Sequence, residues 1–224
     1  MPPDGKRFGL KVVEWIVILL IILVFAGLLF PGSHLGNEER RSMALNYLAQ
    51  FIVATQAFQT DYGTYPVDPR VHWNGNAVYG IPGGAHHNSE VVNVLRADGT
   101  DPGPNFQNAI NSREVVYLDV PQVRDLAHPR AGLGNGKEAN GFGVTTPGEW
   151  YDPWGSPYML FIDASGSGSC DLSLIYTDFT SSGASPNNPH NTVVGVSLGE
   201  DGKIGTGGNG KYEGSDDVID WRGK

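Results

Sequence analysis

Residues 37–60 read NEERRSMALNYLAQFIVATQAFQT, and this stretch decides the fold. Its core-type residues recur at spacings of three and four, at Ala44, Tyr47, Leu48, Phe51, Thr55 and Phe58. Such spacing places them on one face of an amphipathic helix that runs to about Thr60. Asn37 is a candidate N-cap, and Glu38 and Glu39 suit a first turn because the helix dipole favours acidic groups there. The sequence therefore predicts a helix with one buried face.

The chain after this helix predicts a small sheet joined by long loops. Gly63 and Pro66 are helix-ending signals. Alternation and flanking turns predict three short antiparallel strands, at 158–162, within 171–179 and at 192–198. A short helix is predicted over 89–96, 113–120 is a short extended or helical piece, and 128–148 is a Gly-rich loop. The fold class predicted for the exported part is α+β.

The chain before this helix holds a strongly apolar segment, WIVILLIILVFAGLLF at residues 15–30. It spans about 24 Å as a helix, slightly less than a bilayer core of about 30 Å. Lys6, Arg7 and Lys11 place the N-terminus in the cytoplasm, and everything after Pro31 on the other side. Three interpretations compete: a cleaved secretory signal, an uncleaved anchor, and a segment in which Glu14 has a task that offsets its cost in lipid.

The net charge and the cysteine count of the chain exclude some binding partners and covalent links. The 224 residues carry a formal net charge of -9, which makes a nucleic-acid partner a poor candidate. One cysteine, Cys170, excludes an intrachain disulfide.

The N-terminus resembles that of type IV prepilins. Gly9 precedes the apolar Leu10, Glu14 is the fifth residue from Leu10, and Pro31 is the twenty-second. The resemblance implies that a prepilin peptidase cuts between Gly9 and Leu10, that the new terminus is methylated, and that Glu14 is the assembly residue. A Leu10 ammonium on one subunit could neutralise the Glu14 carboxylate of its neighbour and fix their axial register. Two positions depart from the pattern, Phe8 before the cut and Lys11 after it.

The implied fold is type IV pilin-like. A long N-terminal helix, with a membrane half and an amphipathic half, would pack on a small antiparallel sheet with long Gly/Pro-rich loops and a C-terminal calcium-type loop. The implied organisation is a leader at 1–9, a transmembrane and assembly helix at 10–31, the amphipathic half at 32–62 and a globular pseudopilin domain at 63–224. Pro31 and Gly32 would loosen the middle of that helix.

The C-terminal segment 197–221 is Gly-rich and acidic. Its six carboxylates are Glu200, Asp201, Glu213, Asp216, Asp217 and Asp220. Oxygen ligands on a flexible loop suit Ca²⁺, but a solvated acidic loop has the same composition, and both interpretations stay open on the residues alone. It is not an EF-hand, because Lys203 stands where a ligand belongs.

The same segment resembles the C-terminus of the major (G-type) pseudopilin of type II secretion. The matching stretches are SLGEDG at 197–202 and DDVIDW at 216–221, and DPWGSPY at 152–158 resembles a further signature of that family. The resemblance implies a structural Ca²⁺ held by the Leu198 carbonyl and by Asp201, Asp216 and Asp217. For DPWGSPY a structural role suffices, with Trp154 packing on Tyr158.

The leading hypothesis is a non-enzymatic pseudopilin subunit of a type II secretion-like or type IV pilus-like filament. It would be a single-pass protein of the cytoplasmic (inner) membrane, with its C-terminal domain periplasmic or extracytoplasmic. Its partners would be itself, the prepilin peptidase, other pseudopilins and the inner-membrane platform. The alternative is a membrane-anchored extracytoplasmic binding module with an uncleaved signal anchor. An enzyme is disfavoured, because no nucleophile motif or phosphate loop is present, and His86 and His87 are a weak candidate metal pair.

Overall fold

The structure, a computed structural model, describes residues 15–19, 36–68, 70, 75–100, 102–135, 147–178 and 192–220. The chain divides into two compact units, Met1–Gly36 and Asn37–Lys224. In the first unit, residues 15–19 are helical with exposed apolar side chains. The remainder of the segment predicted to span the membrane, 10–31, lies outside the described residues. Among those that are described, no helix combines the length and the apolar content needed to cross a bilayer.

The predicted pilin-like fold class, built on one long N-terminal helix, is wrong in that element. In the described part of the chain, the helix that packs on the sheet is α2 (Asn37–Tyr62), and helical structure before it covers only positions 15–19. Gly36 lies outside the helix. The sequence gives a physical reason, because Pro31 has no amide N–H to donate, and Gly32 and Gly36 disfavour a helix entropically. The fold observed is mixed α/β, with a four-stranded antiparallel sheet.

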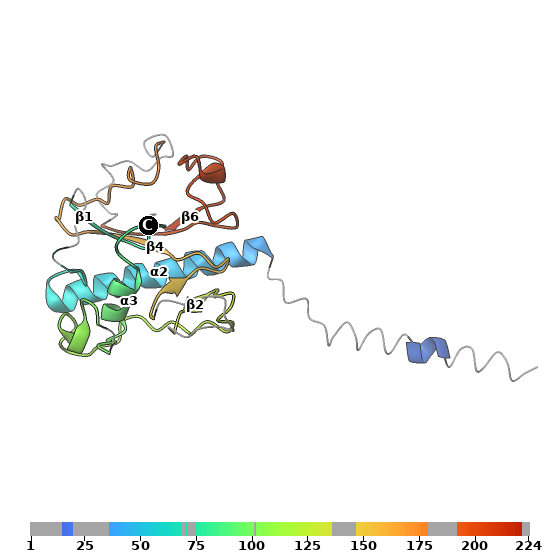
Figure 1. Ribbon diagram of the computed structural model, residues 1–224, viewed down its shortest axis with the longest axis horizontal. Coiled ribbons are helices and arrows are strands. Elements are labelled where there is room, and N and C mark those ends of the chain that lie inside the picture. Colours follow the sequence, from blue (N-terminus) through green and yellow to red (C-terminus); the bar gives the residue numbers. More distant parts are fainter. Residues whose placement is uncertain are drawn as a thin grey trace, which may run out of the picture. The chain divides into compact units, whose positions relative to one another are not determined.

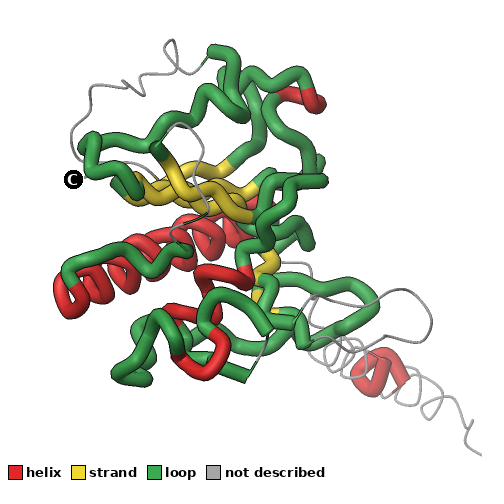
Figure 2. The backbone as a smooth tube through the Cα atoms, turned by 60° about the vertical axis from the view of Figure 1, so that its left-hand side comes forward, coloured by secondary structure: helices red, strands yellow, loops and turns green. Residues whose placement is uncertain are grey.

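Helix α2 confirms the period read from the sequence. Its buried residues are Ala44, Leu48, Phe51, Ala54, Thr55 and Phe58. They face the strands β5 (Val193–Ser197) and β6 (Val218–Asp220). Gly195 in β5 permits this close approach, since a Cβ there would lie 2.5 Å from Cδ2 of Leu48. Figures 1 and 2 show the sheet on one side of α2 and helix α3 (Ser89–Leu95) on the other.

The main sheet has the order β1-β4-β5-β6, and all of its neighbours are antiparallel. Strand β4 (Met159–Asp163) lies inside it, and β1 (Asn76–Tyr79) forms one edge. The predicted strands at 158–162 and 192–198 are confirmed as β4 and β5, and the predicted helix at 89–96 is confirmed as α3. A two-stranded sheet pairs β2 (Gly132–Leu133) with β3 (Trp150–Tyr151). Two 3-10 turns, Phe106–Asn108 and Thr206–Gly208, complete the described elements.

The strand predicted within 171–179 is wrong. The described residues of this segment form turns, with the amides of Ile175 and Tyr176 both donating to the Leu172 carbonyl. Leu172, Ile175 and Tyr176 are buried, while Leu174 is 39% exposed, so the buried positions follow a turn spacing and not an alternation. The segment covers the face of the sheet opposite α2, packing on β4, β5 and β6. Both faces of the sheet are therefore buried.

The DPWGSPY stretch is a turn organised by Asp152. Its Oδ1 accepts hydrogen bonds from the amides of Trp154, Gly155 and Ser156 at 2.9, 2.7 and 2.9 Å. Its Oδ2 accepts one from the Ser197 hydroxyl at 2.5 Å, which ties the turn to the end of β5. The aromatic partner of Tyr158 is Trp150, with ring centroids 4.5 Å apart, and not Trp154 as expected.

Candidate functional site

The acidic C-terminal loop, residues 198–217, connects β5 to β6. Its glycines are structural requirements at the closest approach: Gly199 has φ +63°, and a Cβ there would lie 2.5 Å from the Asp216 carbonyl oxygen. The two ends of the loop therefore run against each other. This brings the predicted ligands Leu198, which is 1% exposed, and Asp201 close in space to the returning Asp216 and Asp217.

Asp216 holds the first turn of the loop. Its Oδ2 accepts hydrogen bonds from the amides of Glu200 at 2.5 Å and Asp201 at 3.0 Å. The Asp201 carboxylate, which is exposed, accepts one from the amide of Lys203 at 2.8 Å. These two carboxylates already order the loop backbone through N–H donors.

Asp217 is the buried carboxylate of the loop, with 1% of its surface exposed. Its Oδ2 accepts hydrogen bonds from the Tyr176 hydroxyl at 2.6 Å and the Gly205 amide at 2.8 Å. Its Oδ1 is buried without a hydrogen-bond partner. An unsatisfied buried charge is costly, so this oxygen leaves the loop incomplete, and it is the charged one of two such atoms there, the other being the Ser215 hydroxyl.

Burial raises the pKa of Asp217, and hydrogen bonds from Tyr176 and Gly205 oppose that rise without cancelling it. The negative charges of Asp216 and Asp201 add to the rise. The three predicted carboxylates are thus near enough to repel one another. A cation bound between them would remove this repulsion and give Oδ1 of Asp217 a partner.

The fit of these residues to Ca²⁺ is chemical and incomplete in geometry. Ca²⁺ takes six to eight oxygen ligands, and carboxylates with a backbone carbonyl are the donor types it prefers. Within the described residues, no three His, Cys, Asp or Glu side chains stand in an arrangement ready to hold a metal ion. A Ca²⁺ site here would need backbone carbonyls among its ligands, and the orphaned Oδ1 of Asp217 is the observation that supports it.

Two residues that hold the loop were not singled out from the sequence. Asp178 accepts hydrogen bonds from the amides of Tyr212 at 2.8 Å and Glu213 at 3.0 Å, and the Glu213 amide is the main reason its pKa is lowered. Tyr176 donates to Asp217 from a position 41 residues away. Interpreting the 171–179 segment as a strand hid both residues, since no local pattern pairs them with the C-terminal loop.

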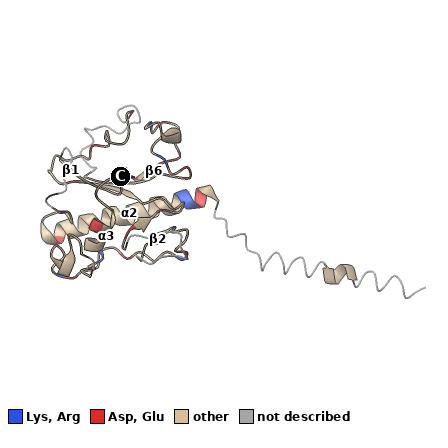
Figure 3. Cartoon of the chain, in the orientation of Figure 1, with Lys and Arg blue, Asp and Glu red and all other residues tan. Residues whose placement is uncertain are grey.

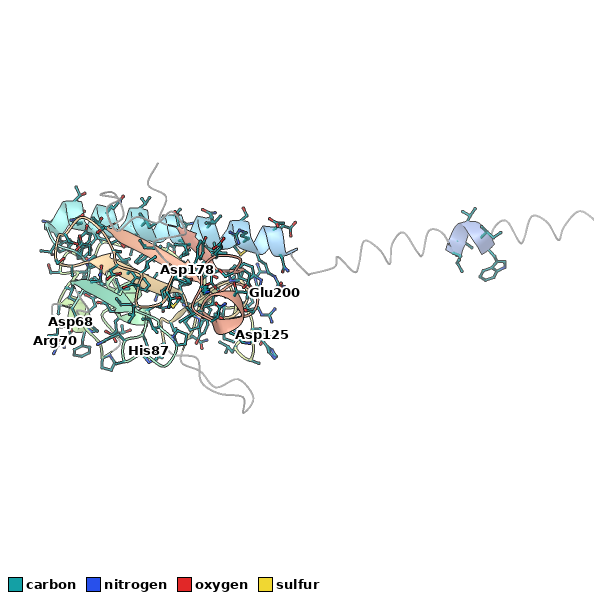
Figure 4. The ribbon with its side chains drawn as sticks, turned by 90° about the horizontal axis from the view of Figure 1, so that it is seen from above. Asp68, Arg70, His87, Asp125, Asp178 and Glu200 are labelled. Atoms are coloured by element: carbon teal, nitrogen blue, oxygen red, sulfur yellow. The ribbon has the colours of Figure 1, made fainter. Side chains whose placement is uncertain are left out.

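The loop is also tied to the beginning of α2. The Asn37 side-chain amide donates to Oε2 of Glu200 at 2.6 Å. Figure 4 labels Glu200 and Asp178 on the C-terminal loop and the segment that holds it. Asn37, predicted as an N-cap, therefore makes its side-chain bond to a residue far along the chain.

The predicted processing residues Gly9 and Leu10 and the predicted assembly residue Glu14 lie outside the described residues. The histidine pair does have carboxylate neighbours. Nδ1 of His86 lies 3.1 Å from Oε2 of Glu90, and Nδ1 of His87 lies 3.2 Å from Oε1 of Glu149. Each histidine thus has its own carboxylate, and the two do not share a ligand group.

A groove of about 220 Å³ lies beside His87. Its lining includes His87, Glu90, Asn93, Asp98 and Asn105.

Comparisons of the chain with family models, with curated proteins and with solved structures find no match.

Proposed function

We propose that this chain is a pseudopilin subunit of a type II secretion-like or type IV pilus-like filament. In this proposal a prepilin peptidase cuts after Gly9, the Leu10 amino group is methylated, and the apolar segment holds the subunit in the cytoplasmic membrane. Glu14 pairs with the terminal ammonium of a neighbouring subunit during assembly. The domain that follows is extracytoplasmic, and the proposal assigns it no reaction.

The observation that carries the proposal is the Asp217 carboxylate. The C-terminal resemblance places a Ca²⁺ ligand at this position, and this carboxylate is buried with one oxygen lacking a partner. A subunit outside the cytoplasm meets Ca²⁺ where it folds, so an incomplete carboxylate is tolerable there. Bound Ca²⁺ would supply charge neutralisation and order, while Tyr176 and Gly205 hold Asp217 in place.

The ligands in this proposal are Asp201, Asp216, Asp217 and the Leu198 carbonyl. Asp216 would exchange at least one of its amide hydrogen bonds for the metal, or use its second oxygen. The partners are other copies of the chain, further pseudopilins, the peptidase and the inner-membrane platform.

The second candidate is a membrane-anchored binding module. The groove beside α3 favours it, because ligand sites are concave and carry a few convergent polar groups. An anchored module needs neither cleavage after Gly9 nor self-association.

The mass of the mature N-terminus, measured on protein from native membranes, tests the proposal. A methylated Leu10 is the expected result, and an intact leader would overturn it in favour of the binding module. Glu14→Ala gives the second readout: the variant should remain in the membrane but fail to assemble. Filaments formed equally well by this variant would remove the role given to Glu14.

A further inference from the structure

The solvent-facing side of α2 is unusual in its charge. Residues 42–60 contain no Asp, Glu, Lys or Arg, over about 28 Å of helix. Exposed helix faces in soluble domains are normally charged or polar. Here Val53 is 65% exposed and Leu45 is 38% exposed. The other exposed positions between 42 and 60 are the small Ala57 and the uncharged polar Ser42, Asn46, Gln50, Gln56 and Thr60. This face therefore carries an apolar row among uncharged polar residues.

The residues of this face form one ridge. Arg41, Leu45, Ala49, Val53, Ala57 and Asp61 follow one another at intervals of four, and we name this set the α2 ridge. Residues four apart on a helix stack into a ridge that can pack against another helix. The ridge has a cation at one end, an anion at the other and apolar side chains between them.

The surroundings leave room along the ridge. A groove of about 380 Å³ runs beside it, between α2 and the 117–119 segment, and includes Ala49, Val53 and Tyr117 in its lining. Val116, the residue before this segment, is 60% exposed and adds apolar surface. Figure 4 shows α2 along one edge of the domain, with side chains on its outer side.

The charged ends are available. Among the described residues Arg41 makes no ion pair, and Asp61 is exposed, accepting one hydrogen bond from the Tyr117 hydroxyl at 2.6 Å. That bond orients the carboxylate and leaves its second oxygen free of any hydrogen bond within the described chain. In Figure 3 the blue and red segments of α2, which mark its charged residues, lie at the ends of the helix.

We propose that the α2 ridge binds the same ridge of a second copy of this chain, in an antiparallel two-fold pair. Reversing one helix sets Arg41 against Asp61 of the partner copy at both ends. It also sets Leu45 against Ala57 and Ala49 against Val53, so that each large side chain meets a small one. Parallel pairing in register would set Arg41 against Arg41 and Val53 against Val53. Charge and size thus agree on one orientation, and the interface is isologous.

The inference does not depend on the proposed function, since it uses residues 41–61 alone and needs no processing of the N-terminus. The experiment uses the full chain in detergent micelles, with mass measured by light scattering and by sedimentation. Val53→Glu should weaken association by about tenfold or more, since it buries a charge at the centre of the pair. A matched pair of variants provides the control. Leu45→Glu changes the ridge and Leu174→Glu changes another segment, while the two leucines are equally exposed, at 38% and 39%. Leu45→Glu should weaken association and Leu174→Glu should not; equal effects would overturn the inference.

Charge reversal and cross-linking test the orientation. Arg41→Glu and Asp61→Arg should each weaken association, and the double variant should recover it. Copies carrying Leu45→Cys mixed with copies carrying Ala57→Cys should cross-link to each other, while Leu45→Cys alone should not. Cys170 is buried and gives little background. Cross-linking of Leu45→Cys with itself, or no recovery in the double variant, would overturn the antiparallel pair. A methylated or unprocessed N-terminus leaves each of these outcomes as it stands.

Discussion

Asp152 and Asp217 are two buried aspartates beside the same sheet, and they differ in how completely the protein satisfies them. Asp152 accepts from three amides on one oxygen and from the Ser197 hydroxyl on the other. Asp217 accepts two hydrogen bonds on one oxygen and none on the other. Burial raises the pKa of both carboxyls.

This difference in hydrogen bonding separates a structural carboxylate, Asp152, from a candidate metal ligand, Asp217. The donors around Asp152 come from its own turn and from the adjacent strand, so this carboxylate completes the fold by itself. The donors around Asp217 come from Tyr176 and Gly205, on two separate segments, and leave Oδ1 unmatched. A structural carboxylate should be insensitive to added cations, and an incomplete one should respond to them.

The largest effect is expected for Asp152→Ala. Three amides and one hydroxyl lose their acceptor, and each buried unsatisfied group costs about 1–3 kcal/mol. The free energy of unfolding, measured in urea, should fall by about 3 kcal/mol or more, with or without Ca²⁺. Ser197→Ala, which removes one of the four donors, is the control and should cost less. Equal losses in the two variants would contradict the central role of Asp152 in this turn.

Calcium should act on the other aspartate. Adding Ca²⁺ should raise the melting temperature of the wild type, and a chelator should reverse the rise. Saturation at about one hundred times the dissociation constant adds roughly 2.7 kcal/mol. Asp217→Asn should abolish the shift. Asp163→Asn should keep it, because Asp163 bonds to Ser165, Ser167 and Gly168 and lies away from the loop. If Ca²⁺ does not change the melting temperature of the wild type, the loop does not bind Ca²⁺.

The smallest effect is a pH dependence without Ca²⁺. The pKa of Asp217 lies above its ordinary value of 3.8, so the folded state binds this proton more tightly than the unfolded state. The free energy of unfolding should therefore gain a contribution as pH falls from neutral through the raised pKa, with no further gain below about 3.8. Asp178, whose pKa is lowered, acts in the opposite sense and loses stability in acid.

Asp178 and the other titrating groups are present both in the wild type and in Asp217→Asn, so comparing the two proteins cancels their contributions. The difference in unfolding free energy between wild type and variant, followed from pH 7 to pH 4, isolates the Asp217 contribution. It should shift in favour of the wild type as pH falls. A difference that stays constant would mean that Asp217 is not strained by its charge.

The parts of the fold that the sequence predicts are those with a local signal, either a helical period or an apolar run bounded by turns. Helix α2 has a repeating buried face, whereas β4 and β5 are five-residue strands buried along their whole length and are predictable from an apolar run between turns; the structure confirms all three. The short edge strands β1 and β6 were missed, because three or four residues between turns show no period. The long helix was wrong because its membrane half was assigned by resemblance, across Pro31 and Gly32.

The candidate site is predictable only in its own loop. The acidic residues 198–217 stand out by composition, but the Tyr176 hydroxyl that holds Asp217 comes from a segment interpreted as a strand. The buried positions of that segment, at Leu172, Ile175 and Tyr176, have a turn spacing that could have given the warning. The contact between Tyr176 and Asp217, 41 residues apart, depends on how the sheet brings these segments together, and a local sequence pattern cannot predict it.

The hydrogen bond from Asn37 to Glu200 gives the domain a particular response to mechanical load. Asn37 is the first residue of α2, and Gly36 joins it to the other unit. Glu200 is itself held through its amide by Asp216, two residues before β6 begins. A force applied at Gly36 therefore acts both on α2 and, through the Asn37–Glu200 hydrogen bond and the C-terminal loop, on strand β6.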